Sequence, residues 1–172
     1  MPTADTAQYV ARIRSLTLGR DPIEILSSTP DELRKLVTGI DAQRLHLRPA
    51  EHKWSAAEIM AHLADSEMMA GVRFRQILSG PNGMAIPAYN QNAWATICMY
   101  EKIPYTQSLV TFSWIRRCNL RLLERLNPTQ MEQYGVHDER GRESVGDILT
   151  LLAGHDINHL QQISSAVAHA SV

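Results

Sequence analysis

Cysteine is scarce in this sequence, and neither sign of charge is in excess. Only Cys98 and Cys118 occur among 172 residues, without a C-x-x-C spacing, so a disulfide framework is disfavoured and a reducing, cytoplasmic location is expected. Neither cysteine has a sequence neighbour that would activate its thiol, and we expect both in or near the core. The 17 lysines and arginines nearly balance 18 aspartates and glutamates. Without a basic stripe, nucleic acid and anionic membranes are not predicted partners.

Long apolar runs are also lacking. No uninterrupted apolar segment approaches membrane-spanning length, and the N-terminus shows no basic region followed by an apolar stretch. A soluble protein that is not exported is therefore expected. With 44% hydrophobic residues, the chain is long enough for one well-buried core and too short for two, which predicts a single domain over residues 1–172.

Sequence patterns typical of β-strands are nearly absent, whereas signals for helix starts and ends are frequent. Apolar residues recur with helical period, and Ser55 with Glu58 and Ser144 with Asp147 form capping-box patterns at two helix starts. Thr29 followed by Pro30 reads as the N-cap and first residue of another helix. Long helices are expected over residues 5–18, 55–78, 105–126 and 144–167, with shorter ones over 22–26 and 30–38. Two long connections between them predict an all-α fold, a four-helix bundle with long crossover connections.

Three histidines form the candidate metal site. His155 and His159 lie one turn apart on a predicted helix, so both imidazoles share one face. His62, on the inward face of the helix over residues 55–78, is the best third ligand. Three histidines from two helices without an obvious fourth ligand describe an open divalent-metal site rather than a closed structural one. The bland alternative is that each histidine is a hydrogen-bonded core residue.

Acidic neighbours of these histidines leave several roles open. Metalloproteases with H-E-x-x-H use the glutamate as a general base, but here Asp156 follows His155, which disfavours protease activity. Asp65 projects near His62 and is the candidate catalytic group: it could orient an imidazole, accept a proton or cap a polar edge of the core. For Asp156 and Glu67 a solvated surface position is expected.

The connection over residues 80–104 is long for a compact domain, and loops of this kind often cover a functional site. A short helix is expected over residues 89–97. The remaining histidines fall in predicted loops or near the C-terminus and are expected at the surface. Among them, His137 is the strongest candidate for a functional role.

The order and spacing of these motifs resemble the DinB/YfiT-like superfamily of metal-dependent four-helix-bundle proteins. The resemblance covers the chain from about Thr29 to the C-terminus. It is carried by the segments 53–59 (KWSAAEI), 62–67 (HLADSE), 90–94 (NQNAW), 136–141 (VHDERG) and 154–163 (GHDINHLQQI). It implies that His62, His155 and His159 are the metal triad and that residues 90–94 form part of the pocket wall. Three neutral imidazoles suit Zn, Ni, Fe or another divalent ion.

The reaction that the resemblance implies first is a thiol-dependent S-transfer or related detoxification. In similar proteins a low-molecular-weight thiol such as bacillithiol or mycothiol attacks a small electrophile, and a divalent cation lowers the pKa of a bound thiol. A metal-dependent hydrolase is the first alternative. A non-enzymatic metal-binding bundle that acts as a dimeric interaction or structural protein is the second. A homodimer is expected in either case.

Overall fold

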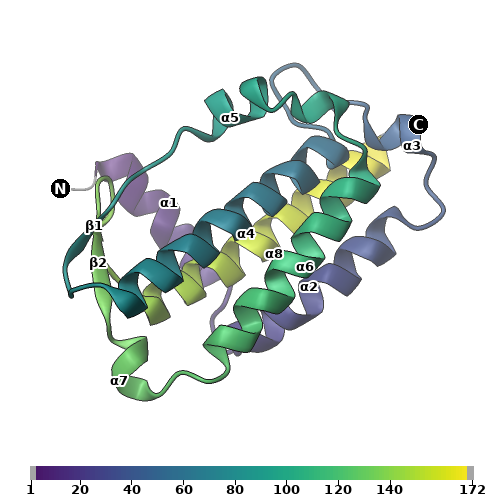
Figure 1. The fold of residues 1–172 in the computed structure, drawn as a ribbon. Coiled ribbons are helices and arrows are strands. Elements are labelled where there is room, and N and C mark those ends of the chain that lie inside the picture. Colours follow the sequence, from purple (N-terminus) through teal and green to yellow (C-terminus); the bar gives the residue numbers. More distant parts are fainter. Residues whose placement is uncertain (1–2, 170–172) are drawn as a thin grey trace.

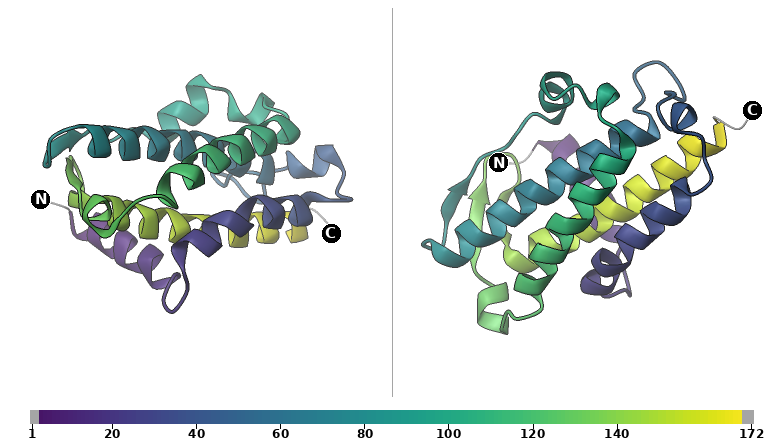
Figure 2. Two further views of the ribbon diagram at one scale, coloured as in Figure 1. Left: turned by 60° about the horizontal axis from the view of Figure 1, so that its bottom comes forward. Right: turned by 45° about the vertical axis from the view of Figure 1, so that its right-hand side comes forward.

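The structure, a computed structural model that describes residues 3–169, is built around four long helices. Figure 1 shows them running side by side, and the left view of Figure 2 shows α4 and α6 in one layer with α2 and α8 in the other. The bundle helices are α2 (Pro22–Val37), α4 (Ala56–Ser79), α6 (Tyr105–Leu123) and α8 (Val145–His169). The expected all-α bundle is confirmed. None of the helices described is long and apolar enough to cross a membrane.

One of the four bundle helices differs from the prediction. The expected helices over residues 22–26 and 30–38 are a single helix, α2, with Pro30 inside it. Proline has no N–H to pair with the carbonyl four residues earlier, and that carbonyl, on Leu26, instead accepts a hydrogen bond from Arg116 Nη1 at 2.8 Å. Thr29 does not cap a new helix, because its hydroxyl donates to the carbonyl of Ile25 at 2.9 Å.

Helix α1 (Ala4–Ser15) lies outside the bundle, although its length suggested a bundle helix. It packs against α8 near the end of the bundle that carries the β-strands (Figure 1). Gly154 makes this approach possible, since a Cβ there would lie 2.1 Å from the carbonyl oxygen of Ile13. Helix α1 therefore covers the segment of α8 that carries His155.

Both predicted capping boxes are present. Ser55 Oγ accepts from Glu58 N at 3.2 Å while Glu58 Oε2 accepts from Ser55 N at 2.8 Å, which fixes the start of α4. Ser144 and Asp147 make the equivalent pair at the start of α8, both hydrogen bonds being 3.0 Å long. These local signals set where the two metal-site helices begin.

A small sheet closes one end of the bundle and was not expected from the sequence. Strands β1 (Met84–Ile86), β2 (Tyr134–His137) and β3 (Gly141–Ser144) pair in that order, β1 parallel and β3 antiparallel to β2. Each strand has only three or four residues, too few for a period-2 pattern to stand out. The expected short helix over 89–97 is α5 (Gln91–Ile97). The other short elements are α3 (Ala42–Leu45), a 3-10 turn, η1 (Tyr100–Lys102), and α7 (Pro128–Met131).

The apolar core is divided into two clusters by a polar layer. One cluster, centred on Leu26, Phe74 and Leu149, lies toward the sheet, and the other, centred on Leu33, Met60 and Ile163, lies toward the opposite end. Each bundle helix contributes one buried polar residue to the layer between the two clusters. These residues are Thr29, Glu67, Arg116 and Asp156. On α8, His155 and His159 flank Asp156 of this layer, whereas His62 lies about one turn before Glu67 on α4.

Candidate metal centre and its pocket

Helices α4 and α8 bring His62, His155 and His159 together, as predicted. His155 Nε2 lies 3.1 Å from His62 Nε2 and 3.1 Å from His159 Nε2, and one ligand atom from each residue lies within 4.8 Å of the others. His62 is 1% exposed and His159 is 7% exposed. A tetrahedral ion with ligands at about 2.0–2.1 Å would separate nitrogens by roughly 3.3 Å. The spacing of the Nε2 atoms is thus close to that of one shared ion.

The protonation state of the three imidazoles also suits a metal. Burial lowers the pKa of His62 to about 3, with a further contribution from His159, and burial lowers the pKa of His159 to about 4. Burial and the two neighbouring histidines lower the pKa of His155 well below its ordinary value. The rings are therefore neutral near pH 7, and each can offer an Nε2 lone pair to one shared cation. The donor set fits a divalent metal ion.

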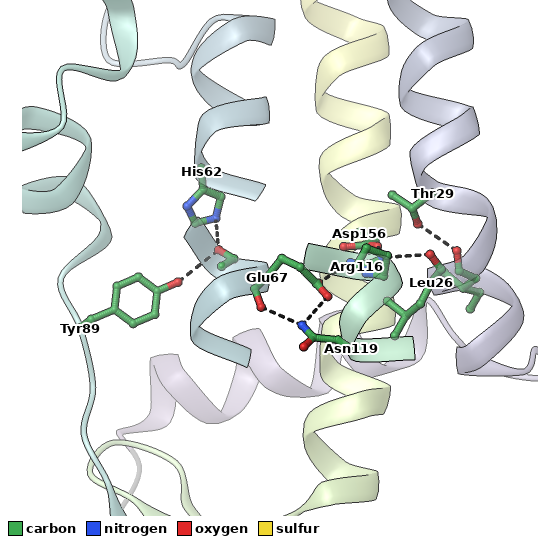
Figure 3. Close-up of polar contacts among 10 residues, drawn as sticks. Leu26, Thr29, His62, Glu67, Tyr89, Arg116, Asn119 and Asp156 are labelled. Atoms are coloured by element: carbon green, nitrogen blue, oxygen red, sulfur yellow. Dashed lines mark hydrogen bonds and ion pairs between the residues drawn. The ribbon is translucent and has the colours of Figure 1, made fainter. Parts of the chain in front are cut away.

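Aromatic and hydroxyl groups surround the triad. The ring of Trp54 packs against His62 with ring centroids 5.0 Å apart. On the other side, Ser66 Oγ lies 3.3 Å from His62 Nε2 and 3.1 Å from the hydroxyl of Tyr89. Figure 3 shows this chain from His62 to Tyr89 on one side of α4. A hydroxyl relay therefore connects the triad with the loop that follows β1.

Asp65, the predicted catalytic group, is held by a different partner. Its Oδ2 accepts a hydrogen bond from the hydroxyl of Tyr100 at 2.5 Å, and burial together with this carboxylate raises the pKa of Tyr100. The ring of Tyr100 in turn meets that of Trp54, with centroids 6.2 Å apart. Asp65 thus connects to His62 through two aromatic rings, and its role in proton transfer stays a prediction.

A pocket of about 810 Å³ adjoins the metal centre, a size typical of small-molecule sites. Ser66 and His155 form part of its wall. Helix α1 and the loops after β1 and β2 supply much of the rest, with Tyr9, Tyr89, Asn90, Arg73, His137 and Arg140 among the lining residues. Of the predicted wall residues 90–94, Asn90 and Gln91 line the pocket, and the Trp94 ring packs against that of Tyr89 with centroids 4.7 Å apart.

Glu67 and Asp156 are not at the surface, and that prediction is wrong. Both side chains are fully buried, and each accepts a hydrogen bond from the buried guanidinium of Arg116 at 2.7 Å (Figure 3). Asn119 Nδ2 adds a hydrogen bond to Glu67 Oε1 at 2.8 Å. We call Glu67, Arg116, Asn119 and Asp156 the buried charge cluster. A signal was available, because Arg116 and Asn119 continue the inward stripe of α6 between Phe112 and Leu123.

Other surface assignments also changed. Cys98 and Cys118 are free and exposed rather than in or near the core. His137, in contrast, is 2% exposed and lines the pocket. No local pattern pointed to Arg73 or Tyr89, because the contacts that place them in the pocket join segments far apart in the chain.

Comparison with known proteins supports the fold and identifies the family. A protein of Oceanobacillus iheyensis, named “Putative metal-dependent hydrolase”, is 29% identical over 143 residues, covering 83% of this chain and 82% of that relative. A Bacillus mycoides protein of the same description is 26% identical with the same coverage. The solved structure of YfiT from Bacillus subtilis, titled a probable metal-dependent hydrolase with an unusual four-helix bundle topology, matches with a TM-score of 0.78 at 20% identity, covering 96% of this chain and 88% of YfiT. Residues 25–163 match the sequence model of the DinB superfamily, and the chain therefore belongs to that family.

Proposed function

We propose that this protein is a divalent-metal-dependent hydrolase of small molecules. The observation that carries the proposal is the convergence of three neutral histidine Nε2 atoms at the wall of a pocket of about 810 Å³. His62, His155 and His159 would hold the ion, which would supply Lewis acidity and an activated water. The names of the relatives from Oceanobacillus and Bacillus favour hydrolysis over thiol transfer.

The chain's own residues divide the remaining work. The hydroxyls of Ser66 and Tyr89, 3.1 Å apart beside His62, are placed to donate hydrogen bonds to a developing oxyanion. Trp54 shields one side of the triad from water by covering the ring of His62. Asp65 is the proposed base, and the Tyr100 hydroxyl fixes its orientation.

Thiol-dependent transfer remains the second candidate, because the same open site could take a thiolate in place of water. It rests on the family resemblance, and no thiol-binding group in the pocket singles it out. The two reactions differ in one measurable respect. Hydrolysis proceeds without a thiol, whereas transfer requires one and consumes it stoichiometrically.

The test begins with elemental analysis of tag-free protein and of His62→Ala and His159→Ala, with the exposed His169→Ala as the matched control. We expect about one equivalent of metal in the wild type and His169→Ala, and loss of metal in the other two. Ester and amide substrates are then assayed with and without bacillithiol or mycothiol. Turnover that survives metal removal, or triad variants that keep their metal, would contradict the proposal.

The structural alternative makes a separate prediction. If the metal only links helices, chelation unfolds the protein; if the site is catalytic, chelation abolishes turnover and leaves the helical circular-dichroism signal intact. The buried charge cluster already joins the four helices, so we expect the second result. Asp65→Asn, which should keep both metal and fold, tests the proposed base through its loss of turnover.

A further inference from the structure

Arg73 brings an unpaired positive charge to the wall of the pocket. It lies on α4, is 8% exposed, and donates from Nη2 to the carbonyl of Pro87 at 3.1 Å. Its guanidinium lies 5.7 Å from the centre of the Tyr89 ring. The Nε atom is buried without a hydrogen-bond partner, and within residues 3–169 no carboxylate forms an ion pair with Arg73. Burying such a cation without an anion is costly.

His137, on β2, faces Arg73 with a proton rather than a lone pair. Its Nδ1 accepts a hydrogen bond from the backbone N–H of Glu139 at 3.1 Å. In a neutral imidazole the nitrogen that accepts carries no proton, so the proton is on Nε2. Burial lowers the pKa of His137 to about 4, with Arg140 and Arg73 adding to the effect. The ring is therefore neutral, and its protonated Nε2 lies beside Arg73 Nη2 at 3.3 Å.

Two hydrogen-bond donors consequently meet without an acceptor. Arg73 Nη2 and His137 Nε2 are 3.3 Å apart, and a guanidinium cannot accept a hydrogen bond. Neither group satisfies the other. An oxygen positioned against both would accept from the two donors at once, and a negatively charged oxygen would also compensate the guanidinium.

Nearby acidic groups do not fill this role. Glu143 is occupied by Arg140, at 2.7 and 2.9 Å for its two oxygens. Asp138 accepts from the backbone N–H of Ala88 at 3.2 Å, and Asp5 and Glu139 are exposed. Apolar residues of α8 also line the pocket, including Ile148, Leu151 and Leu152. The pocket thus combines one oxyanion position with an apolar surface.

We infer that Arg73 and His137 form an oxyanion subsite, so that the substrate is a small molecule carrying a carboxylate or phosphate group that anchors it at this end of the pocket. The rest of the substrate extends past Tyr89 and Ser66 to His155 and the metal centre. This step rests on the proposed function, since it treats the bound anion as part of the substrate. Arg73 is then a binding residue that sets specificity, and it acts at a distance from the reacting bond.

A purely structural role for Arg73 is the competing explanation, because it also tethers the loop after β1 through Pro87. The experiment uses metal-free wild-type protein, so that anions cannot bind to the ion. Acetate, inorganic phosphate and the neutral isostere acetamide are titrated at constant ionic strength, and histidine side-chain ¹H–¹⁵N NMR follows Nε2–H of His137. We expect saturable shifts with acetate or phosphate and none with acetamide. The tighter of the two anions identifies the chemical class.

Two variants separate binding from structure. Arg73→Met should weaken anion binding roughly tenfold or more, whereas Arg75→Met should leave it unchanged. Arg75 is on the same helix but bonds to the Gly71 carbonyl and to Asn119. If Arg73→Met does not fold, His137→Phe removes the other donor and should weaken binding in the same direction. Isothermal titration calorimetry measures binding to every variant, because His137→Phe lacks the NMR signal.

The inference is overturned if neither anion shifts His137, if acetamide binds as tightly as acetate, or if Arg73→Met and His137→Phe bind anions like the wild type. Metal content and hydrolysis are measured on the same preparations. If the protein is fully loaded with metal but binds no anion, the oxyanion subsite is refuted and the proposed function stands. If it binds anions but takes up no metal, the proposed function is refuted and the oxyanion subsite stands.

Discussion

Replacing Arg116 by methionine should destabilise the protein strongly, because it leaves two carboxylates buried without a cation. Glu67 and Asp156 are both 0% exposed and each lies 2.7 Å from the guanidinium. Removing one partner of a buried ion pair costs about 3–5 kcal/mol. The carbonyl of Leu26, which Pro30 leaves without a helical donor, also loses its hydrogen bond, for roughly 1 kcal/mol more.

For a domain of this size each kcal/mol shifts Tm by about 2–4 °C, so Arg116→Met should melt roughly 8–24 °C below the wild type. Thermal and urea denaturation followed by circular dichroism measure the loss. Arg117→Met is the matched control: its side chain lies over the exposed ring of Trp114, and a surface change of this kind should stay within about 0.5 kcal/mol.

Two further measurements show whether uncompensated charge is the cause. The triple variant Arg116→Met, Glu67→Gln, Asp156→Asn should recover much of the lost stability, because neutral amides tolerate burial better than carboxylates. Burial raises the pKa of Asp156 and Arg116 opposes that effect. Without the guanidinium the pKa of Asp156 should rise further, so the deficit relative to the wild type should shrink as the pH falls. A triple variant as unstable as Arg116→Met, or a deficit independent of pH, would refute the reasoning.

Three further predictions concern α1, the triad and assembly. Gly154→Ala should lower stability by at least 1–3 kcal/mol by overpacking, about 2–12 °C in Tm, because its Cβ would lie 2.1 Å from the Ile13 carbonyl oxygen; an unchanged melting curve would contradict the close approach. Metal-free protein should lose stability as the pH falls from about 6.5 toward about 4. Burial lowers the pKa of His62 to about 3 and that of His159 to about 4, so the unfolded chain takes up these protons at a higher pH than the folded protein. Urea midpoints that stay constant over this range would contradict the prediction. The expected homodimer should dissociate in Trp114→Glu if it uses the α4 and α6 face, where Trp114 is 61% exposed; sedimentation of the wild type as a monomer would end that prediction.

Features coded by neighbouring residues could be predicted from the sequence. Ser55 with Glu58 marks the start of α4 because the two hydrogen bonds that they make are local. The four-residue spacing of His155 and His159 likewise places them on one face of α8. The triad needed only one further assumption, that the inward faces of α4 and α8 meet.

Features that depend on contacts between distant segments could not be predicted in this way. Pro30 resembles the first residue of a helix. Only the structure shows that Arg116 donates a hydrogen bond to the Leu26 carbonyl, which the proline leaves without a helical partner. Asp156 looks like a surface residue because its partner is 40 residues away on α6. The pairing of β1 with β2 joins segments about fifty residues apart, and the same pairing places His137 beside Arg73. Much of the pocket therefore could not be predicted from the sequence, whereas the triad could.

The position of the buried charge cluster bears on whether this protein folds before or after it binds a metal ion. One side chain, Arg116 on α6, bonds to the α2 backbone, to Glu67 on α4 and to Asp156 on α8. The two histidine-bearing helices are thus joined through protein groups beside the triad, and an ion is not needed to bring them together. We therefore expect a metal ion to bind after folding, with the folded apoprotein as a preformed acceptor. Since three imidazoles accept several divalent ions, we expect the available supply of metal to decide which ion is bound.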